Sequence, residues 1–403
     1  MRILFIHQNF PGQFRHLAEY LSKDSNHQVI AICQPHAPKL AGVQVIQYQP
    51  SRAPSQHIHH YIRSTELHVL NGQAVAKLLF NLKESGFYPD IVVAHTGWGE
   101  ALYVKDVFPK TKLIGFFEFY YQATGTDADF DPEFPNTLDD ILRIRTKNIT
   151  HLLSLEAVDA GICPTEWQKS THPKEYQHKL HLIHEGINTK VATPKTDAIY
   201  YLPNGRTLSR NDEVITYVAR NLEPYRGFHI MMRALELICQ RRPKTQFLII
   251  GGDEVSYGRK LEKGDTWRKR MLKEISIDES RVHFYGRVPY QNYLQTLQIS
   301  SAHIYLTVPF VLSWSILEAM AVGCPVIGSN TAPVREVIEH GRNGQLVDFF
   351  SITEIADAVD KLITDFDNTE KLRLAARQTI LDHYTTSRGI RQYMDLFHSL
   401  LND

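Results

Sequence analysis

Short apolar runs, each followed by a segment long enough for a helix, recur along almost the whole chain and constrain its fold more than any other feature. A polar connector at residues 187–212 separates two series of these runs, which lie at residues 2–6, 29–33, 90–95, 112–117, 160–164, 213–220, 246–252, 281–286, 302–307 and 325–329. Apolar runs that alternate with helical segments are typical of buried parallel strands. The sequence therefore predicts two doubly wound α/β domains facing a central cleft, with ligands at the carboxyl ends of the strands.

The domain boundary is predicted to fall within the polar connector. We place the first Rossmann-like domain at residues 1–200 and the second at residues 201–385. Residues 386–403 belong to a stretch with helical periodicity and no strand pattern. We expect them to form a C-terminal helix that crosses back to the first domain.

Composition excludes several classes of protein. The 403 residues carry 44 basic and 44 acidic side chains, so the chain lacks the positive excess typical of nucleic-acid binders, and we expect no nucleic-acid partner. Cys33, Cys163, Cys239 and Cys324 form no CxxC pair, which argues against disulfides and zinc and indicates a cytoplasmic protein. No run of about 18 apolar residues offers a membrane span, and the N-terminal run is too short for a signal peptide. Any membrane contact is therefore expected to be peripheral.

The stretch PFVLSWSILEAMAVGCPVIGS, residues 309–329, combines an anion-binding pattern with one acid. It predicts a helix over residues 314–322, capped by Ser313 and ended by Gly323. The backbone amides near Ser313, including those of Leu312 and Trp314, cluster at the helix start, where unpaired N–H groups and the helix dipole favour an anion.

Glu318 lies one turn inside this predicted helix, on the face that carries Trp314 and Ser315. A carboxylate behind an anion site suits two vicinal hydroxyls, such as a ribose diol, because it only accepts hydrogen bonds. The alternative is a structural acid that binds a neighbouring loop.

Two arginines bracket the turn that follows the strand at residues 213–220. Arg220 ends this strand, and Arg226 with Gly227 opens the next helix. Two guanidinium groups at the carboxyl end of a strand match a diphosphate through charge-assisted hydrogen bonds. The alternative is two solvated arginines, one of them paired with Glu223.

Several motifs together resemble a known family. YVARNLEPYRGF, LIIGGDE, VHFYGRVPYQNYL, the stretch around Glu318 and PVREVIEHGRNGQLV resemble, in this order, the nucleotide-sugar half of retaining family 4 glycosyltransferases (glycosyl transferases group 1) of the GT-B fold. MRILFIHQNFPGQFRHLAEYL, PDIVVAHTGWGE and CPTEWQKS resemble the other half, so the resemblance spans nearly the whole chain. It implies an acceptor-side first domain and a second domain that binds the nucleotide sugar.

The resemblance also implies roles for individual residues. The implied catalytic residues are His95, near the donor sugar, and the two arginines that neutralise the donor diphosphate, Arg220 and Arg226. Arg287 and Val288 are the implied contacts of the base, Glu318 of the ribose, Gly12 of the diphosphate and Phe310 of the sugar. The amides of Leu312, Ser313 and Trp314 are the implied contacts of the distal phosphate, and Gly252 is a further donor-binding residue. Glu118 is the acceptor-side candidate, although a paired buried acid is the alternative, as a structural histidine is for His95.

The chain departs from the family pattern at three positions. The family has an acidic pair, a Glu followed eight positions later by a second Glu, and counting back from Glu318 gives Phe310. Arg226 stands where the family usually has lysine, with one extra residue between it and Arg220, and Gly12 stands where the family often has two glycines. The departure at Phe310 bears on the identity of the sugar and, to a lesser degree, on activity.

The resemblance implies a retaining hexosyltransferase that moves a sugar from a nucleotide-diphosphate donor, UDP-sugar first and GDP-mannose next, to a saccharide or lipid-linked acceptor in surface glycan synthesis. In this family retention is usually explained by front-face attack, with the leaving diphosphate accepting the proton, so no cofactor or metal is expected. The main alternative is a pseudo-enzyme or partner subunit that binds nucleotide without turnover. A nicotinamide-dependent oxidoreductase is disfavoured, because NFPGQF after the first strand lacks the GxGxxG fingerprint.

Other candidate sites are interpreted as structural. The acidic loop at residues 125–135 has Pro132 where a calcium loop needs glycine and Leu138 where it needs glutamate, so we expect a loop without metal at the cleft. The histidines of HIHH, residues 57–60, have no carboxylate or cysteine close by in the sequence, and a polar loop is favoured.

Overall fold

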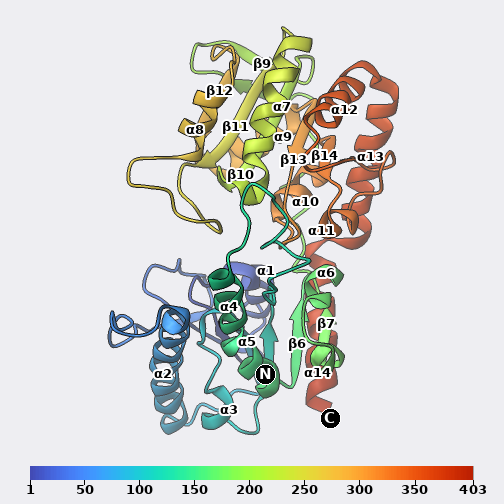
Figure 1. The fold of residues 1–403 in the computed structure, drawn as a ribbon. Helices are drawn as coiled ribbons and strands as arrows, with labels where there is room; N and C mark the ends of the chain where they lie inside the picture. The colour runs from blue at the N-terminus through green and yellow to red at the C-terminus, as the bar shows by residue number, and fades with distance from the viewer. Residues whose placement is uncertain (403) are drawn as a thin grey trace. The chain divides into compact units, whose positions relative to one another are not determined.

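The computed structural model describes residues 1–402 and divides the chain into two compact units (Figure 1). Unit 1 comprises Met1–Gly186 together with the C-terminal segment from Thr386, and unit 2 comprises Ile187–Thr385. The division thus falls at Gly186 and not at residue 200, because residues 198–202 pack against Val214 and Leu248 in a core cluster of unit 2. None of the helices within residues 1–402 combines the length and apolar character that crossing a membrane requires.

Unit 1 is built on a seven-stranded parallel sheet with the strand order β3-β2-β1-β4-β5-β6-β7. Its strands are β1 (Arg2–Ile6), β2 (Gln28–Cys33), β3 (Gln44–Gln47), β4 (Ile91–His95), β5 (Lys112–Phe116), β6 (Ala160–Cys163) and β7 (Leu180–Leu182). Five of these strands coincide closely with the predicted runs. β3 and β7 were not predicted, because QVIQ and LHL are short and carry polar residues.

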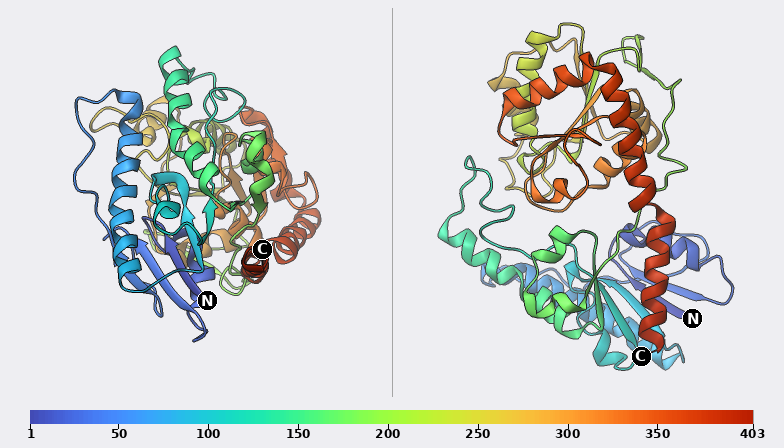
Figure 2. Two further views of the ribbon diagram at one scale, coloured as in Figure 1. Left: turned by 90° about the horizontal axis from the view of Figure 1, so that it is seen from below. Right: turned by 90° about the vertical axis from the view of Figure 1, so that its right-hand side faces the viewer.

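Helices cover both faces of this sheet. The helical segments of unit 1 are η1 (Gly12–Phe14), α1 (Arg15–Leu21), η2 (His60–Ile62), α2 (Arg63–Glu84), η3 (Thr96–Trp98), α3 (Val104–Val107), α4 (Leu138–Lys147), α5 (Ile149–Ala157), α6 (Glu166–Ser170), η4 (Lys174–Lys179) and α14 (Thr386–Asn402). Alternate strand residues face opposite sides: Phe5 lies in one core cluster with α1 and α14, and Leu4 lies in another with α2 and α5. Figure 2 shows α14, in red, running along unit 1. The C-terminal helix therefore completes the core of unit 1, to which Phe397 contributes a fully buried ring.

Unit 2 repeats the design with a six-stranded parallel sheet in the order β12-β11-β10-β13-β14-β15. Its strands are β10 (Val214–Asn221), β11 (Gln246–Gly252), β12 (Val282–Gly286), β13 (Ala302–Tyr305), β14 (Val326–Ser329) and β15 (Gln345–Val347), and the connector forms the separate hairpin β8 (Ile199–Tyr201) and β9 (Thr207–Ser209). The first five sheet strands match predicted runs, whereas β15 and the hairpin were not predicted.

The helices of unit 2 position the residues that the sequence singled out. They are η5 (Pro224–Arg226), α7 (Phe228–Arg241), α8 (Trp267–Glu274), α9 (Tyr290–Ile299), α10 (Trp314–Ala321), α11 (Ala332–Arg335), α12 (Ile352–Thr364) and α13 (Phe366–His383). α9, α10 and α13 share one core cluster with β14, and Figure 1 shows α7 and α12 over the other face. α10 follows the sequence prediction: Ser313 is its N-cap, and Gly323 adopts a left-handed conformation just beyond its end.

Candidate functional site

The carboxyl edge of the unit 2 sheet collects most of the predicted binding residues. β12, β11, β10 and β13 are adjacent parallel strands, so their last residues, Gly286, Gly252, Asn221 and Tyr305, lie along one edge. Ligands of doubly wound sheets bind at this edge, where the loops leave the strands. The contacts at this edge decide what each candidate side chain can do.

Arg226 is buried at this edge and is held by two neighbouring segments, β10 and the end of β13 with its following loop. Its Nη1 donates to Thr307 Oγ1 at 2.8 Å and to the Val311 carbonyl at 3.0 Å, and it lies 3.5 Å from the hydroxyl of Tyr305. The Tyr217 hydroxyl of β10 donates to the Arg226 carbonyl at 2.7 Å. The guanidinium is thus preorganised by its hydrogen bonds to the protein.

Arg220 differs from Arg226, because it is exposed at the end of β10. Within residues 1–402, Glu223 forms no ion pair with either arginine; its carboxylate instead accepts three backbone N–H bonds, from Ser256, Tyr257 and Gly258, at 3.0–3.1 Å. Glu223 therefore fixes the loop after β11 and does not neutralise the positive charge of Arg220 or Arg226.

The N-terminus of α10 adjoins Arg226 through a shared tyrosine. The Ser313 amide donates to the Tyr305 hydroxyl at 2.9 Å, so one of the three amides expected to bind a phosphate has a protein partner. The Ser313 hydroxyl accepts from the Ser315 amide at 3.3 Å, as an N-cap does. Tyr305 thus ties the start of α10 to the arginine.

Glu318 lies half-buried one turn inside α10 and binds two tyrosines. Its Oε1 accepts from the Tyr290 hydroxyl at 2.6 Å, and its Oε2 accepts from the Tyr293 hydroxyl at 2.8 Å. Burial raises the pKa of Glu318, and the two tyrosine hydrogen bonds oppose that rise. The carboxylate is thus oriented by α9.

Arg287 and Gly252 lie together at the carboxyl ends of β12 and β11. Arg287 Nη2 contacts Glu254 at 2.6 Å and Asn221 Oδ1 at 3.3 Å, and both Arg287 and Glu254 are exposed. A Cβ atom at Gly252 would lie 2.5 Å from Asn221 Oδ1, so only glycine fits without displacing that side chain. Val288 follows Arg287 and is half-buried against the cluster that contains α9 and α10.

Phe310 is buried in a group of aromatic rings before α10. Its ring centroid lies 5.6 Å from that of Tyr225 and 5.1 Å from that of Tyr257. The Arg226 guanidinium carbon lies 5.5 Å from the Tyr257 ring centroid. The position where the resembled family has an acid is therefore part of an aromatic wall next to the buried arginine.

Unit 1 gathers its candidates at the corresponding edge of its own sheet. Gly12 has a φ of +45°, and a Cβ atom there would lie 2.5 Å from His7 Nε2, so the turn after β1 requires glycine. His7 Nδ1 accepts from the Asn9 amide at 3.0 Å, which places the proton of the neutral ring on Nε2. His7 Nε2 then donates to Gln13 Oε1 at 2.7 Å, and Gln13 Nε2 donates to Glu118 Oε1 at 3.3 Å.

His95 is also neutral with a defined tautomer. Its Nδ1 accepts from the Gly97 amide at 3.1 Å, so the ring proton lies on Nε2, 3.9 Å from Glu118 Oε2. The ring stacks on Trp98 with centroids 3.9 Å apart. Burial, with His7 and His151 close by, holds the pKa of His95 well below its usual value. Gly12, His95 and Glu118 thus lie in one cluster, in which His95 offers an N–H donor.

Sequence reasoning missed the side chains that hold the predicted ones in place. Tyr290, Tyr293 and Tyr305 orient Glu318 and the start of α10, and His7 and Gln13 link Gly12 to Glu118. A signal for the first two exists: their spacing of three puts both on one face of the helix that follows Arg287 and Val288.

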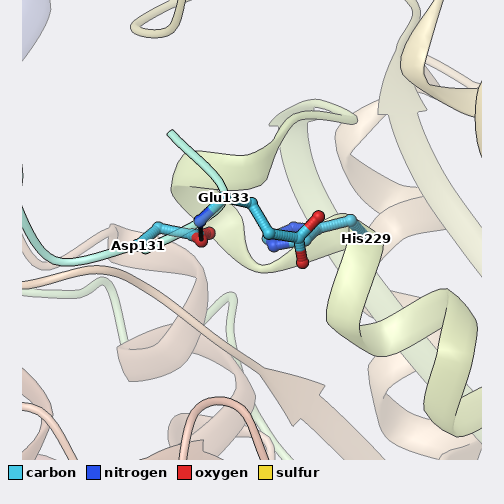
Figure 3. A group of neighbouring side chains, drawn as sticks. All are labelled: Asp131, Glu133 and His229. Atoms are coloured by element: carbon cyan, nitrogen blue, oxygen red, sulfur yellow. Dashed lines mark hydrogen bonds between the residues drawn. The ribbon is translucent and has the colours of Figure 1, made fainter. Parts of the chain in front are cut away.

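The acidic loop between β5 and α4 contains Asp131 and Glu133. Figure 3 draws both with His229 of α7, and within the loop the Glu133 amide donates to Asp131 Oδ1 at 3.0 Å. Because His229 belongs to unit 2 and the carboxylates belong to unit 1, we assign no metal site to these side chains.

Two family models match most of the chain. The glycosyl transferase family 4 group model matches residues 25–192, and the glycosyl transferases group 1 model matches residues 204–379. A methyl-CpG binding domain model matches residues 156–249, a range that includes parts of both units and corresponds to no compact part of this fold.

Curated relatives match parts of the chain. An N-acetyl-alpha-D-glucosaminyl L-malate synthase of Bacillus anthracis is 28% identical over 134 residues, which cover 33% of this chain and 34% of the relative. An alpha-maltose-1-phosphate synthase of Mycolicibacterium smegmatis is 23% identical over 271 residues, which cover 61% of this chain and 65% of the relative. The chain therefore spans less than two thirds of either relative's length.

Solved structures match the whole chain. A sucrose-phosphate synthase from Thermosynechococcus elongatus aligns with a TM-score of 0.77 at 17% identity and covers 100% of this chain and 99% of that one. HepE of Anabaena in complex with UDP aligns with a TM-score of 0.68 at 17% identity and covers 99% of this chain and 100% of that one. These likenesses establish the fold.

Proposed function

Because this chain belongs to the family 4 glycosyltransferases and has the GT-B fold, we propose that it transfers a hexose-type sugar from a nucleotide-diphosphate donor with retention of configuration. The acceptor in this proposal is a saccharide or a lipid-linked saccharide of a surface glycan. The protein works in the cytoplasm, with at most peripheral contact with the inner face of the membrane.

One observation carries the donor site: the buried Arg226, the N-terminus of α10 and the half-buried Glu318 follow one another at the carboxyl edge of unit 2. Tyr305 links the first two through its hydroxyl, and Glu318 lies one turn further into α10. A cation next to a helix N-terminus suits a diphosphate, and a carboxylate behind them suits the hydroxyls of a ribose. In this proposal Arg226 and the start of α10 face the phosphates, and Glu318 faces the ribose.

The proposed reaction needs stabilisation of the leaving group more than it needs a protein nucleophile. Negative charge grows on the departing diphosphate, and Arg220, Arg226 and the start of α10 supply positive charge and dipoles there. Arg226 is preorganised by Thr307 and Val311, so it needs little reorganisation when the bond breaks. These groups can act without a metal ion, and the acceptor proton goes to the leaving diphosphate.

Uridine is the favoured base and guanosine the next. Structures of the similar HepE contain UDP or UDP-glucose, and a Mycobacterium tuberculosis relative, 38% identical over 64 residues, is described as GDP-mannose-dependent. In this chain Arg287 and Val288 at the end of β12 are the proposed base contacts.

The unit 1 cluster is proposed to bind hydroxyl groups. His95 offers a neutral N–H donor, and Glu118, whose side chain is 43% exposed, offers an acceptor 3.9 Å away. Such a pair suits a sugar hydroxyl, which both donates and accepts.

Thermal shift with UDP, GDP and ADP, followed by the matching nucleotide sugars, tests the proposal. A ligand at 100 times its Kd stabilises a protein by about 2.7 kcal/mol, so the correct diphosphate should raise the Tm clearly. Consumption of the matching donor with a saccharide acceptor should then follow. No stabilisation by any diphosphate would contradict the proposed donor site.

A nucleotide-binding pseudo-enzyme or partner subunit is the second candidate, and the position of Phe310 favours it. This buried ring replaces the first acid of the family's pair and packs between two tyrosines. Binding of a nucleotide sugar without its consumption, across a panel of acceptors, would support this candidate over the transferase.

A further inference from the structure

The two tyrosines that bind Glu318 differ in exposure although they share one helix. Tyr293 is 8% exposed, and its hydroxyl donates to Oε2 from the interior of the α9–α10 contact. Tyr290 is the first residue of α9, is 45% exposed, and donates to Oε1. Their ring centroids lie 5.8 Å apart. One oxygen of the acid is therefore held from inside the protein and the other from the solvent side.

This difference has a chemical consequence for any ligand of Glu318. A vicinal diol that binds a carboxylate donates to its oxygens, and the Tyr290 hydroxyl already donates to Oε1. The exposed ring of Tyr290 can rotate into solvent, whereas the buried Tyr293 is fixed by packing with Leu294, Leu297 and Leu317. A diol can therefore replace the first hydroxyl more readily than the second.

We propose that Tyr293 is a positioning residue that keeps Glu318 oriented, and that Tyr290 is an exchangeable occupant of Oε1 that the ribose diol of the donor displaces. The inference rests on the proposed function, because it takes the ribose as the ligand of Glu318. It adds a mechanism by which α9 tunes nucleotide affinity: the Tyr290 hydroxyl competes with the ligand, and the Tyr293 hydroxyl prepares the site for it.

Ionisable groups around Glu318 make the positioning role measurable through pH. The groups that face its carboxylate in unit 2 are Tyr290 and Tyr293. The Cys324 thiol adds to the rise in the pKa of Tyr293 that burial and Glu318 cause. Burial raises the pKa of Glu318, and each tyrosine hydrogen bond opposes the rise. Loss of the Tyr293 hydroxyl should therefore shift protonation of Glu318 to higher pH, which a purely structural role of the ring would not do.

Calorimetric titration with UDP and with uridine at pH 8 tests the proposal on four variants. Tyr290→Phe should bind both ligands about three- to tenfold more tightly, since a competing hydrogen bond is removed. Tyr293→Phe should bind both about three- to tenfold more weakly. Tyr201→Phe, at a tyrosine that is 69% exposed on β8, is the matched control and should equal the wild type. Glu318→Gln should weaken both ligands.

The pH arm uses uridine, because the phosphates of UDP titrate near pH 6 themselves. As the pH is lowered from 8, wild-type affinity should fall when Glu318 becomes protonated, and the midpoint of this fall should lie at higher pH in Tyr293→Phe than in the wild type. An unmoved midpoint would overturn the positioning role. Unchanged or weaker binding by Tyr290→Phe would contradict the proposal that the Tyr290 hydroxyl competes with the ribose diol for Glu318.

The outcomes separate this inference from the proposed function. If Glu318→Gln binds UDP as the wild type does, the ribose role of Glu318 in the proposed function fails. If Glu318→Gln weakens binding and Tyr290→Phe has no effect, only the inference fails. If Tyr293→Phe does not fold, Tyr290→Phe, at an exposed position, still tests whether the ribose diol displaces the Tyr290 hydroxyl from Glu318.

Discussion

The two units share a parallel-sheet design but differ in the chemistry at the carboxyl edges of their sheets. Unit 1 places His7, His95 and Glu118 there, with both imidazoles neutral and buried. Unit 2 places Arg226 and Glu318 there, with tyrosine hydroxyls around them. Permanent positive charge suits phosphate, whereas neutral donors and acceptors suit hydroxyl groups. The same architecture thus carries two groups of residues with different chemistry at the ends of its strands.

Buried histidines extend this contrast beyond the sites. In unit 1, burial lowers the pKa of His7, His68 and His172 to about 4 and that of His151 to about 3. In unit 2, burial lowers the pKa of His303 to about 4. Unit 1 therefore carries most of the histidines that must gain a proton when the protein unfolds in acid.

The largest expected effect is a selective loss of stability of unit 1 in acid. Each buried histidine has a folded pKa below its unfolded value near 6.5, so its contribution is full above pH 6.5 and is lost as the pH falls toward 4. At about 1.4 kcal/mol per pKa unit, protonation of His7, His68, His151 and His172 together should lower the free energy of unfolding of unit 1 by several kcal/mol. Hydrogen exchange at pH 7 and pH 5, corrected for intrinsic rates, should show the greater loss of protection in unit 1.

A matched pair of variants sharpens this test. His151→Gln removes a buried imidazole and should flatten the pH dependence of unit 1, whereas His178→Gln, at an exposed position, should leave it unchanged. Equal losses of protection in both units would contradict the claim that unit 1 is the more sensitive of the two to acid.

The next largest effect concerns the permanent charges of unit 2. Arg226→Ala should weaken binding of UDP by about 1.5–3 kcal/mol, the scale of a charged hydrogen bond, while uridine should bind as before. Because Arg226 also bonds Thr307 and Val311, its loss should lower the stability of unit 2 as well. Arg220→Ala, at an exposed position, should weaken UDP without that loss of stability. Equal losses for UDP and uridine would show that Arg226 acts through packing.

A buried acid in unit 1 should respond to pH in the opposite sense to the histidines. Glu100 is 1% exposed, accepts from the Tyr48 hydroxyl at 2.6 Å, and has a pKa raised to about 7 by burial. Its folded pKa exceeds its unfolded value near 4.5, so its contribution to stability is present below pH 4.5 and is lost as the pH rises through 7. Glu100→Gln should therefore stabilise the protein by about 1–3 kcal/mol at pH 8 and by much less at pH 5.5. Urea unfolding at the two pH values measures this, and an equal effect at both would contradict it.

Much of the fold followed from local pattern, and the exceptions have physical reasons. Central strands such as β1, β4 and β11 are buried on both faces, so their residues are almost all apolar and easy to recognise. β3 and β15 lie at sheet edges and keep polar residues, and the β8–β9 hairpin is outside the main sheet. The pair Asn204-Gly205 was nonetheless a readable hairpin signal.

The candidate sites were less accessible to sequence reasoning than the strands. The turn after a strand was enough to propose Arg226, since parallel strands bring their ends together. Glu318 was proposed from its place one turn inside a predicted helix, and His95 from the family resemblance together with its position at a strand end. The partners of these residues depend on side-chain packing between elements that are distant in sequence, as in the bond from Ser313 to Tyr305. No periodicity encodes such a bond.

The smallest expected effect on nucleotide binding is at Phe310, where unit 2 carries a ring in place of charge. The ring cannot accept a hydrogen bond from a sugar hydroxyl, so Phe310→Ala should change donor-sugar selectivity or turnover and leave the affinity for UDP within about twofold. The wild type should still transfer sugar, because no step of the proposed mechanism needs a carboxylate at this position.

Truncation of this buried ring also carries a packing cost of about 3–5 kcal/mol in stability, so Phe310→Leu is the matched variant that keeps most of the apolar volume. Calorimetry with UDP and competition between UDP-glucose and UDP-galactose measure affinity and selectivity separately. If both variants alter selectivity alike and keep UDP affinity, the aromatic wall selects the sugar and the charges of unit 2 bind the nucleotide independently of it. If UDP affinity falls in both variants, Phe310 supports Arg226 through Tyr257. The aromatic wall and the charges of unit 2 then do not act independently.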